Sequence, residues 1–97
     1  MTFKIVIEPR ALADVQSAIN YYDEQQAGLG KKFNTVLEKH ISYLIKNPFF
    51  QVAYKDYRVL PLKKYPFVIF FYIDDSNHTV YITAVFNTHQ DTSKYPE

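Results

Sequence analysis

The chain has 97 residues, carries a formal net charge of +1 at pH 7 and contains no cysteine. This length suits a single domain, residues 1–97, with one hydrophobic core, and the lack of cysteine excludes a disulfide framework and thiolate metal sites. No apolar run approaches the ~20 residues of a membrane helix, and the first residues lack the apolar segment and cleavage site of a signal peptide. We therefore expect a cytoplasmic protein without a membrane partner.

The first expected element is a strand over residues 3–8, in which Phe3, Ile5 and Ile7 alternate with mostly polar residues. Pro9 ends this strand because it has no N–H to donate, and it suits the first turn of a following helix. The strand should therefore have one apolar face and lead directly into a helix.

Two helices are expected next, because apolar residues recur at spacings of three and four over residues 9–28 and again over residues 31–47. Pro48 ends the second helix, since the residue before a proline disfavours helical geometry. The permissive glycines of Gly28-Leu29-Gly30 favour a short connection and hence an antiparallel helical hairpin. The apolar stripes are Leu12, Val15, Ile19 and Tyr22 in the first helix and Phe33, Leu37, Ile41, Leu44 and Ile45 in the second.

His40 lies beside the second stripe and has two interpretations. It could serve as a catalytic base, but the only acidic or thiol side chain at a sensible spacing is Glu38. We favour the other interpretation, a partly buried histidine of the helix.

The strongest strand signal is residues 66–73, which are apolar at every position and are followed by turn residues and a second apolar run over residues 79–86. A strand that is apolar on both faces is typical of the centre of a sheet, so a hairpin is expected there. By simple alternation, one face of the second run should carry Val80, Ile82, Ala84 and Phe86, and the other Tyr81, Thr83 and Val85.

A further strand is expected over residues 57–62, with Pro61 restricting it to an edge or an early exit, and residues 51–54 can begin another. The resulting order, β-α-α-β-β-β, describes an α+β domain in which a helical hairpin packs on a largely antiparallel, twisted sheet. Residues 88–97 lack any periodicity and are expected to form an irregular C-terminal tail.

The near-neutral net charge conceals a basic middle of the chain. Residues 28–64 hold eight cationic side chains against two carboxylates, a local charge of +6. Such a segment suits an anionic partner, and its alternative interpretation is a solvated helix face with the neighbouring loop. The eight cations are Lys31, Lys32, Lys39, Lys46, Lys55, Arg58, Lys63 and Lys64.

Short motifs along most of the chain, in this order and at these spacings, resemble the RelE/ParE superfamily of toxin–antitoxin toxins, and within it the ParE-like plasmid-stabilisation branch. The motifs at the helices are Pro9 with Ala11 and Asp14, Ile19-Asn20-Tyr21-Tyr22, Gly28-Leu29-Gly30 with Phe33, and Asn47-Pro48. Those at the strands are Arg58, Lys64-Tyr65-Pro66-Phe67, Tyr72-Ile73-Asp74, and Ala84-Val85-Phe86-Asn87 followed by Asp91.

The resemblance implies a bacterial toxin that forms a hetero-oligomer with a cognate antitoxin. ParE-like members are associated with poisoning DNA gyrase, whereas RelE-like members cut messenger RNA on the ribosome. A degenerate toxin that only binds its antitoxin is a third alternative. No cofactor or metal is expected, because the sequence has no glycine-rich phosphate loop and no cluster of metal ligands.

Residues for RelE-like cleavage are depleted in this sequence. The nuclease branch places basic residues on the strand before the hairpin, on the first hairpin strand and after the last strand, with a tyrosine in the tail. Arg58, His89 and Tyr95 could fill such roles here, but residues 67–73 contain no cation. Since cationic groups that face developing charge are the largest catalytic contribution, we expect docking rather than cleavage.

Arg58 is the leading candidate for a contact with the target or the antitoxin, as a fork that can hold a phosphate or a carboxylate. Its alternative interpretation is a surface salt bridge to Asp56 or Asp91. The full set of candidate contact residues is Lys55, Arg58, Lys63, Lys64, Asn87 and His89.

Overall fold

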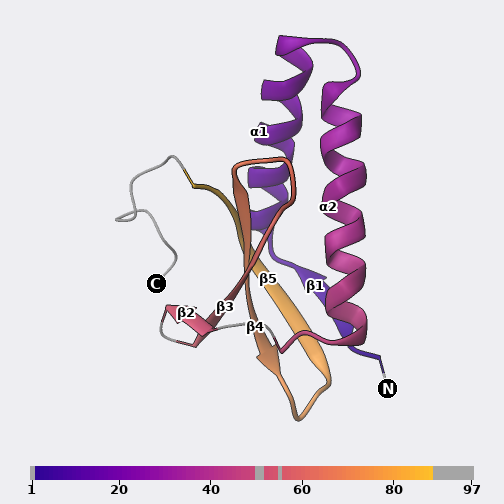
Figure 1. Cartoon of the computed structure of the whole chain (residues 1–97). Helices are drawn as coiled ribbons and strands as arrows, with labels where there is room; N and C mark the ends of the chain where they lie inside the picture. Colours follow the sequence, from indigo (N-terminus) through magenta and orange to yellow (C-terminus); the bar gives the residue numbers. More distant parts are fainter. Residues whose placement is uncertain (1, 50–51, 55, 89–97) are drawn as a thin grey trace.

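A computed structural model describes residues 2–49, 52–54 and 56–88 of the chain. Two helices, α1 (Pro9–Gln25) and α2 (Leu29–Lys46), lie side by side over one face of a five-stranded sheet (Figure 1). The strands are β1 (Lys4–Ile7), β2 (Val52–Tyr54), β3 (Tyr57–Pro61), β4 (Phe67–Asp74) and β5 (Thr79–Asn87). The predicted α+β fold is therefore confirmed, with β2 as a short strand of its own.

The strand order β1-β5-β4-β3-β2 puts β4 in the middle of the sheet. β4 pairs antiparallel with β5 on one side and with β3 on the other, as its run of apolar residues predicted. β1 pairs parallel with β5, where Ile5 lies opposite Val80. The sheet is consequently mixed but mostly antiparallel.

A β-bulge at Thr83 interrupts the alternation of β5. Phe71 of β4 lies opposite Ile82, whereas Phe70 lies opposite Ala84, so Thr83 has no partner residue on β4. The Thr83 hydroxyl instead donates to the carbonyl oxygen of Phe70 at 3.3 Å. An extra residue of this kind reverses the faces of all the side chains that follow it.

The expectation that Val80, Ile82, Ala84 and Phe86 share one face is therefore wrong. Val80, Ile82 and Val85 belong to the core beneath the helices. Ala84 and Phe86 instead pack with Phe70 in a second cluster on the other face. Without the bulge, Val85 would turn away from the helices.

The main core lies between the helical hairpin and the sheet. Phe33 of α2 and Phe71 of β4 are each 0% exposed, and a ring cluster joins Phe33 to Tyr22, Tyr65 and Phe67. The Tyr22 and Phe33 rings stack and the other two pairs meet edge to face, with centroid separations near 5 Å, and both arrangements are favourable for aromatic rings. This cluster fixes the hairpin against the beginning of β4.

Two glycines shape the connection between the helices. Gly28 has a φ of 93°, a left-handed geometry that glycine adopts without strain. Gly30 allows α2 to approach α1 closely, because a Cβ atom there would lie 2.6 Å from the Ile19 carbonyl oxygen. Its N–H donates to the Asp23 carboxylate at 2.8 Å, so α2 begins at Leu29, slightly before the predicted start.

The start of α1 and the end of α2 agree with the sequence, whereas α1 ends at Gln25, before the expected position near Gly28. Pro9 occupies the first turn of α1, and Asn47 is the C-cap of α2 immediately before Pro48. Within the part of the chain that the structure describes, neither helix is long and apolar enough to cross a membrane.

Candidate partner-binding surfaces

Arg58 lies half-buried on β3, beside the middle of the sheet. Its guanidinium carbon lies 5.5 Å from the centroid of the Phe49 ring, a cation–π geometry that the sequence did not suggest. A hollow of about 390 Å³ next to it is lined by Asp56, Arg58, Tyr72 and Ile73. The suggested partner Asp91 lies outside the described residues.

Lys63 and Lys64 lie in the exposed turn between β3 and β4. Lys64 has a φ of 73°, and the Lys63 N–H donates to Nε2 of His40 at 3.3 Å. The other ring nitrogen of His40, Nδ1, lies 2.7 Å from the carbonyl oxygen of Val36 and therefore donates to it. His40 is 4% exposed, so it is a structural histidine that attaches the turn to α2, as favoured above.

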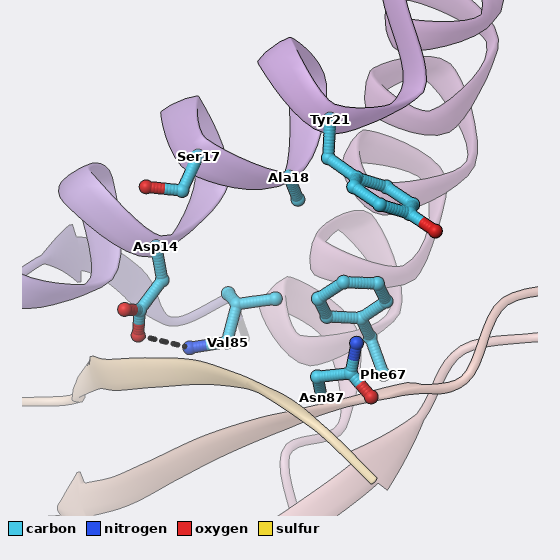
Figure 2. Close-up of a pocket in the computed structure, with 7 residues that line it drawn as sticks. All are labelled: Asp14, Ser17, Ala18, Tyr21, Phe67, Val85 and Asn87. Carbon is cyan, nitrogen blue, oxygen red and sulfur yellow. Dashed lines mark hydrogen bonds between the residues drawn. The ribbon is translucent and has the colours of Figure 1, made fainter. Parts of the chain in front are cut away.

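Asn87 ends β5 and lines a second hollow of about 320 Å³, which opens between α1 and the ends of β4 and β5 (Figure 2). The side chains around it come from successive turns of α1 and from the two strands. Its lining residues are Asp14, Ser17, Ala18, Tyr21, Phe67, Val85 and Asn87.

The hollow borders a stretch of β5 that β1 does not cover. Pairing of β1 with β5 ends at Ile7 opposite Ile82, because the chain enters α1 at Pro9. Further along β5, the Val85 N–H donates to the Asp14 carboxylate at 3.0 Å (Figure 2). Asp14 thus satisfies a backbone donor at an edge of the sheet where such groups are otherwise unpaired.

Sequence reasoning did not assign this role to Asp14. The residue lies three positions after Ala11 and four before Ala18, and both alanines are buried. A carboxylate at that spacing belongs to the buried side of α1. This spacing is the signal by which the contact with the sheet could have been found.

Burial raises the pKa of Asp14 above its ordinary value of 3.8, while the Val85 N–H and the charge of Arg10 lower it in part. A raised pKa means that the folded state holds the proton more tightly than the unfolded state. Protonated Asp14 therefore makes its full contribution to the free energy of unfolding below pH 3.8. This contribution is lost as pH rises through the pKa that Asp14 has in the folded state.

An Asp14→Asn variant is expected to be at least as stable as the parent at neutral pH, because asparagine still accepts from Val85 and buries no charge. Asp14→Ala should lose about 1–3 kcal/mol, since it leaves that N–H unpaired. Urea unfolding between about pH 3 and pH 7 measures both effects. Equal destabilisation of the two variants would contradict the role of the acceptor oxygen.

The structure does not gather the candidate contact residues into one site. Asn87 lies opposite Phe67 and Arg58 lies opposite Phe71, so they are offset by about 13 Å along β4 and flank it on opposite sides. The turn with Lys63 and Lys64 lies at the Asn87 end, since Leu62 N–H donates to Phe67 O. Lys55, His89 and Tyr95 lie outside the described residues.

Among residues 2–49, 52–54 and 56–88, no three histidine or acidic side chains are close enough to hold a metal ion. The described surfaces offer hydrogen-bonding groups, exposed apolar side chains and single cations. That chemistry suits contacts with another macromolecule.

A helical hairpin on a mostly antiparallel sheet, with partly open edges and shallow hollows, thus defines a small α+β protein with surfaces suited to a partner. The family model described as the ParE toxin of type II toxin-antitoxin systems, parDE, matches residues 5–92. The chain belongs to this family, and the resemblance that its motifs indicated is confirmed.

The fold is also similar to a solved structure of the chromosomal ParDE TA system from P. aeruginosa, with a TM-score of 0.78. The match covers 90% of this chain and 97% of the other at 15% sequence identity, so it bears on the fold alone. No curated protein sequence matches the chain.

Proposed function

We propose that this ParE-family protein arrests bacterial growth by docking on DNA gyrase in the cytoplasm, and that a cognate antitoxin silences it in a hetero-oligomer. Such a module would serve plasmid stabilisation. The observation that carries the docking mechanism is the composition of β4. This strand forms the centre of the sheet and has no cationic side chain.

Cleavage of RNA by phosphoryl transfer requires cations aimed at the developing charge and groups that move protons. On the face of β4 away from the helices, the side chains are Val68, Phe70 and Tyr72, with Asp74 at the end. None of these can neutralise a phosphate. The central strand therefore supports binding without catalysis.

Binding to a large protein tolerates such a surface, because a few residues carry most of the affinity. Arg58 suits this role, since its half-buried position and the Phe49 ring restrict the guanidinium to few orientations. A restricted side chain loses less entropy on binding than a mobile one. Lys63 and Lys64 add exposed positive charge at the β3–β4 turn.

For the antitoxin we propose the hollow beside the uncovered stretch of β5. Tyr21 of α1 lines this hollow and is 56% exposed. Exposed apolar side chains beside an open strand edge suit an amphipathic segment or an added strand. Acidic residues on that segment would complement Lys63 and Lys64, which lie at the same end of β4.

The test is a supercoiling assay with purified gyrase, run beside primer extension on messenger RNA bound to translating ribosomes. We expect the parent protein to inhibit supercoiling and to leave the message intact. Arg58→Ala should weaken inhibition by about tenfold, the effect of a hot-spot residue, while Lys32→Ala on α2 is the matched control for loss of one charge. Tyr95→Phe should have little effect.

The same assay tests neutralisation. The product of the adjacent open reading frame, added in equal amount, should restore supercoiling. Discrete ribosomal A-site cuts that disappear with Arg58→Ala would overturn the docking proposal in favour of a RelE-like messenger RNA interferase. A protein that affects neither assay but binds the adjacent product would be a degenerate toxin.

A further inference from the structure

A row of side chains crosses the sheet on the face away from the helices. Val6 of β1 lies opposite Tyr81 of β5, which lies opposite Tyr72 of β4. The pairing of Arg58 with Phe71 puts Tyr57 of β3 next in the row. We call Tyr57, Tyr72 and Tyr81 the tyrosine row.

The rings of the row contact one another in an ordered way. Tyr72 and Tyr81 stack with centroids 5.0 Å apart and planes at 15°, and Tyr57 stands at 81° to Tyr72 with centroids 6.2 Å apart. Tyr72 and Tyr81 are half-buried, and Val6 beside Tyr81 is 41% exposed. The Tyr81 end of the row therefore reaches the surface.

Two carboxylates, Glu8 and Asp74, influence the electrostatic potential at the tyrosine row. Glu8 is the N-cap residue of α1, but its side chain makes no capping hydrogen bond. Asp74 accepts hydrogen bonds from Ser76 and Asn77, which lower its pKa and keep it ionised. The pKa of Tyr72 is raised, mainly by burial and then by the charges of Glu8 and of neighbouring groups that include Asp74. The two carboxylates therefore create a negative potential at the Tyr72 hydroxyl.

We propose that the Tyr81 end of the tyrosine row, with Glu8, binds an exposed arginine side chain on the protein target of the toxin. A guanidinium stacks on aromatic faces and forms paired hydrogen bonds with a carboxylate. Both features occur together here, whereas Arg58 lies opposite the core residue Phe71, so its side chain is on the other face of the sheet, where it shares a hollow with Asp56.

We assign the arginine to the target protein, and not to the antitoxin, because the partner at this site must complement the negative charges of Glu8 and Asp74. The antitoxin proposed above is acidic where it faces the lysines of the β3–β4 turn, and an acidic segment does not complement Glu8 and Asp74. Single-stranded RNA could stack on tyrosine rings, but the two carboxylates would repel its phosphates. The identity of the partner rests on the proposed docking function, whereas the chemistry of the site does not depend on it.

The test uses the full chain and a tetra-arginine peptide, followed through the NMR signals of the tyrosine rings. Peptide binding should shift the Tyr72 and Tyr81 signals, and an oligouridine should not. Glu8→Gln and Tyr72→Leu should each weaken binding by about two- to fivefold. Tyr72→Phe, which keeps the ring, should bind like the parent, as should Glu24→Gln, an exposed charge change on α1.

If Glu8→Gln and Glu24→Gln weaken peptide binding equally, the peptide responds only to the net charge of the protein, and the proposed arginine site is wrong. Shifts caused by oligouridine but not by the peptide would also overturn it, in favour of RNA. If the peptide binds through Glu8 while gyrase is not inhibited, the proposed target fails and the arginine site stands. If gyrase is inhibited but the peptide does not bind, the arginine site fails alone.

Discussion

A Phe71→Asp variant is expected not to fold. Phe71 is 0% exposed and lies on the middle strand, opposite Ile82 on one side and Arg58 on the other. The substitution removes about 1.5–3 kcal/mol of apolar burial and puts a carboxylate into the core, where water cannot reach it. A small domain has only about 5–15 kcal/mol of total stability, so the two losses together should exceed it or nearly so.

Thermal melting followed by far-UV circular dichroism measures this effect. The matched control is Leu12→Asp, which makes a similar change at a helix position that is 55% exposed and should melt cooperatively like the parent. A soluble Phe71→Asp protein with a cooperative transition would contradict the central, buried position of β4.

Gly30→Ala is expected to destabilise the protein by about 1–3 kcal/mol, the range for overpacking. The new methyl group would lie 2.6 Å from the backbone oxygen of Ile19 and 2.8 Å from Cγ of Asp23. Backbone cannot move aside as a side-chain end can, so α1 and α2 would have to separate and lengthen the bond from Gly30 N–H to Asp23. The gain in helix propensity, about 1 kcal/mol, should not compensate.

Gly28→Ala provides the comparison for this prediction. A Cβ atom at Gly28 would have no neighbour within 4 Å, so only the left-handed φ of 93° opposes the change. That conformation costs an alanine about 1–2 kcal/mol. Urea unfolding of both variants separates the two causes. Ile19→Ala removes the Cγ2 atom that would lie 2.7 Å from the new methyl group at position 30, so it should partly rescue only Gly30→Ala. A Gly30→Ala protein more stable than the parent would show that the helices are not in close contact there.

The sequence alone determined the elements and their types. The spacing of apolar residues in α1 and α2, Pro9 at the start and Asn47-Pro48 at the end are local signals, and the structure follows them. The unbroken apolar run of residues 66–73 also placed β4 at the centre of the sheet, because burial on both faces permits few polar side chains.

The candidate contact residues were less accessible to sequence reasoning. Arg58, Lys63 and Lys64 were chosen for their charge, but charge does not reveal the ring of Phe49 under Arg58 or the bond from Lys63 to His40. These contacts join segments that are separate in the chain. Their geometry depends on how the hairpin lies on the sheet.

Only the tertiary structure decided which face each residue of β5 presents and which groups meet at the sheet edge. The register of β5 against β4 shifts by one residue at Thr83, which forms the bulge. The alternation of apolar and polar residues within β5 does not show how β5 pairs with its neighbour, so the sequence could not predict this shift. The bond from Val85 to Asp14 spans 71 residues and forms only because β1 gives way to α1 before β5 ends. Local propensity determines which elements form, whereas contacts between distant segments depend on packing that the whole chain determines together.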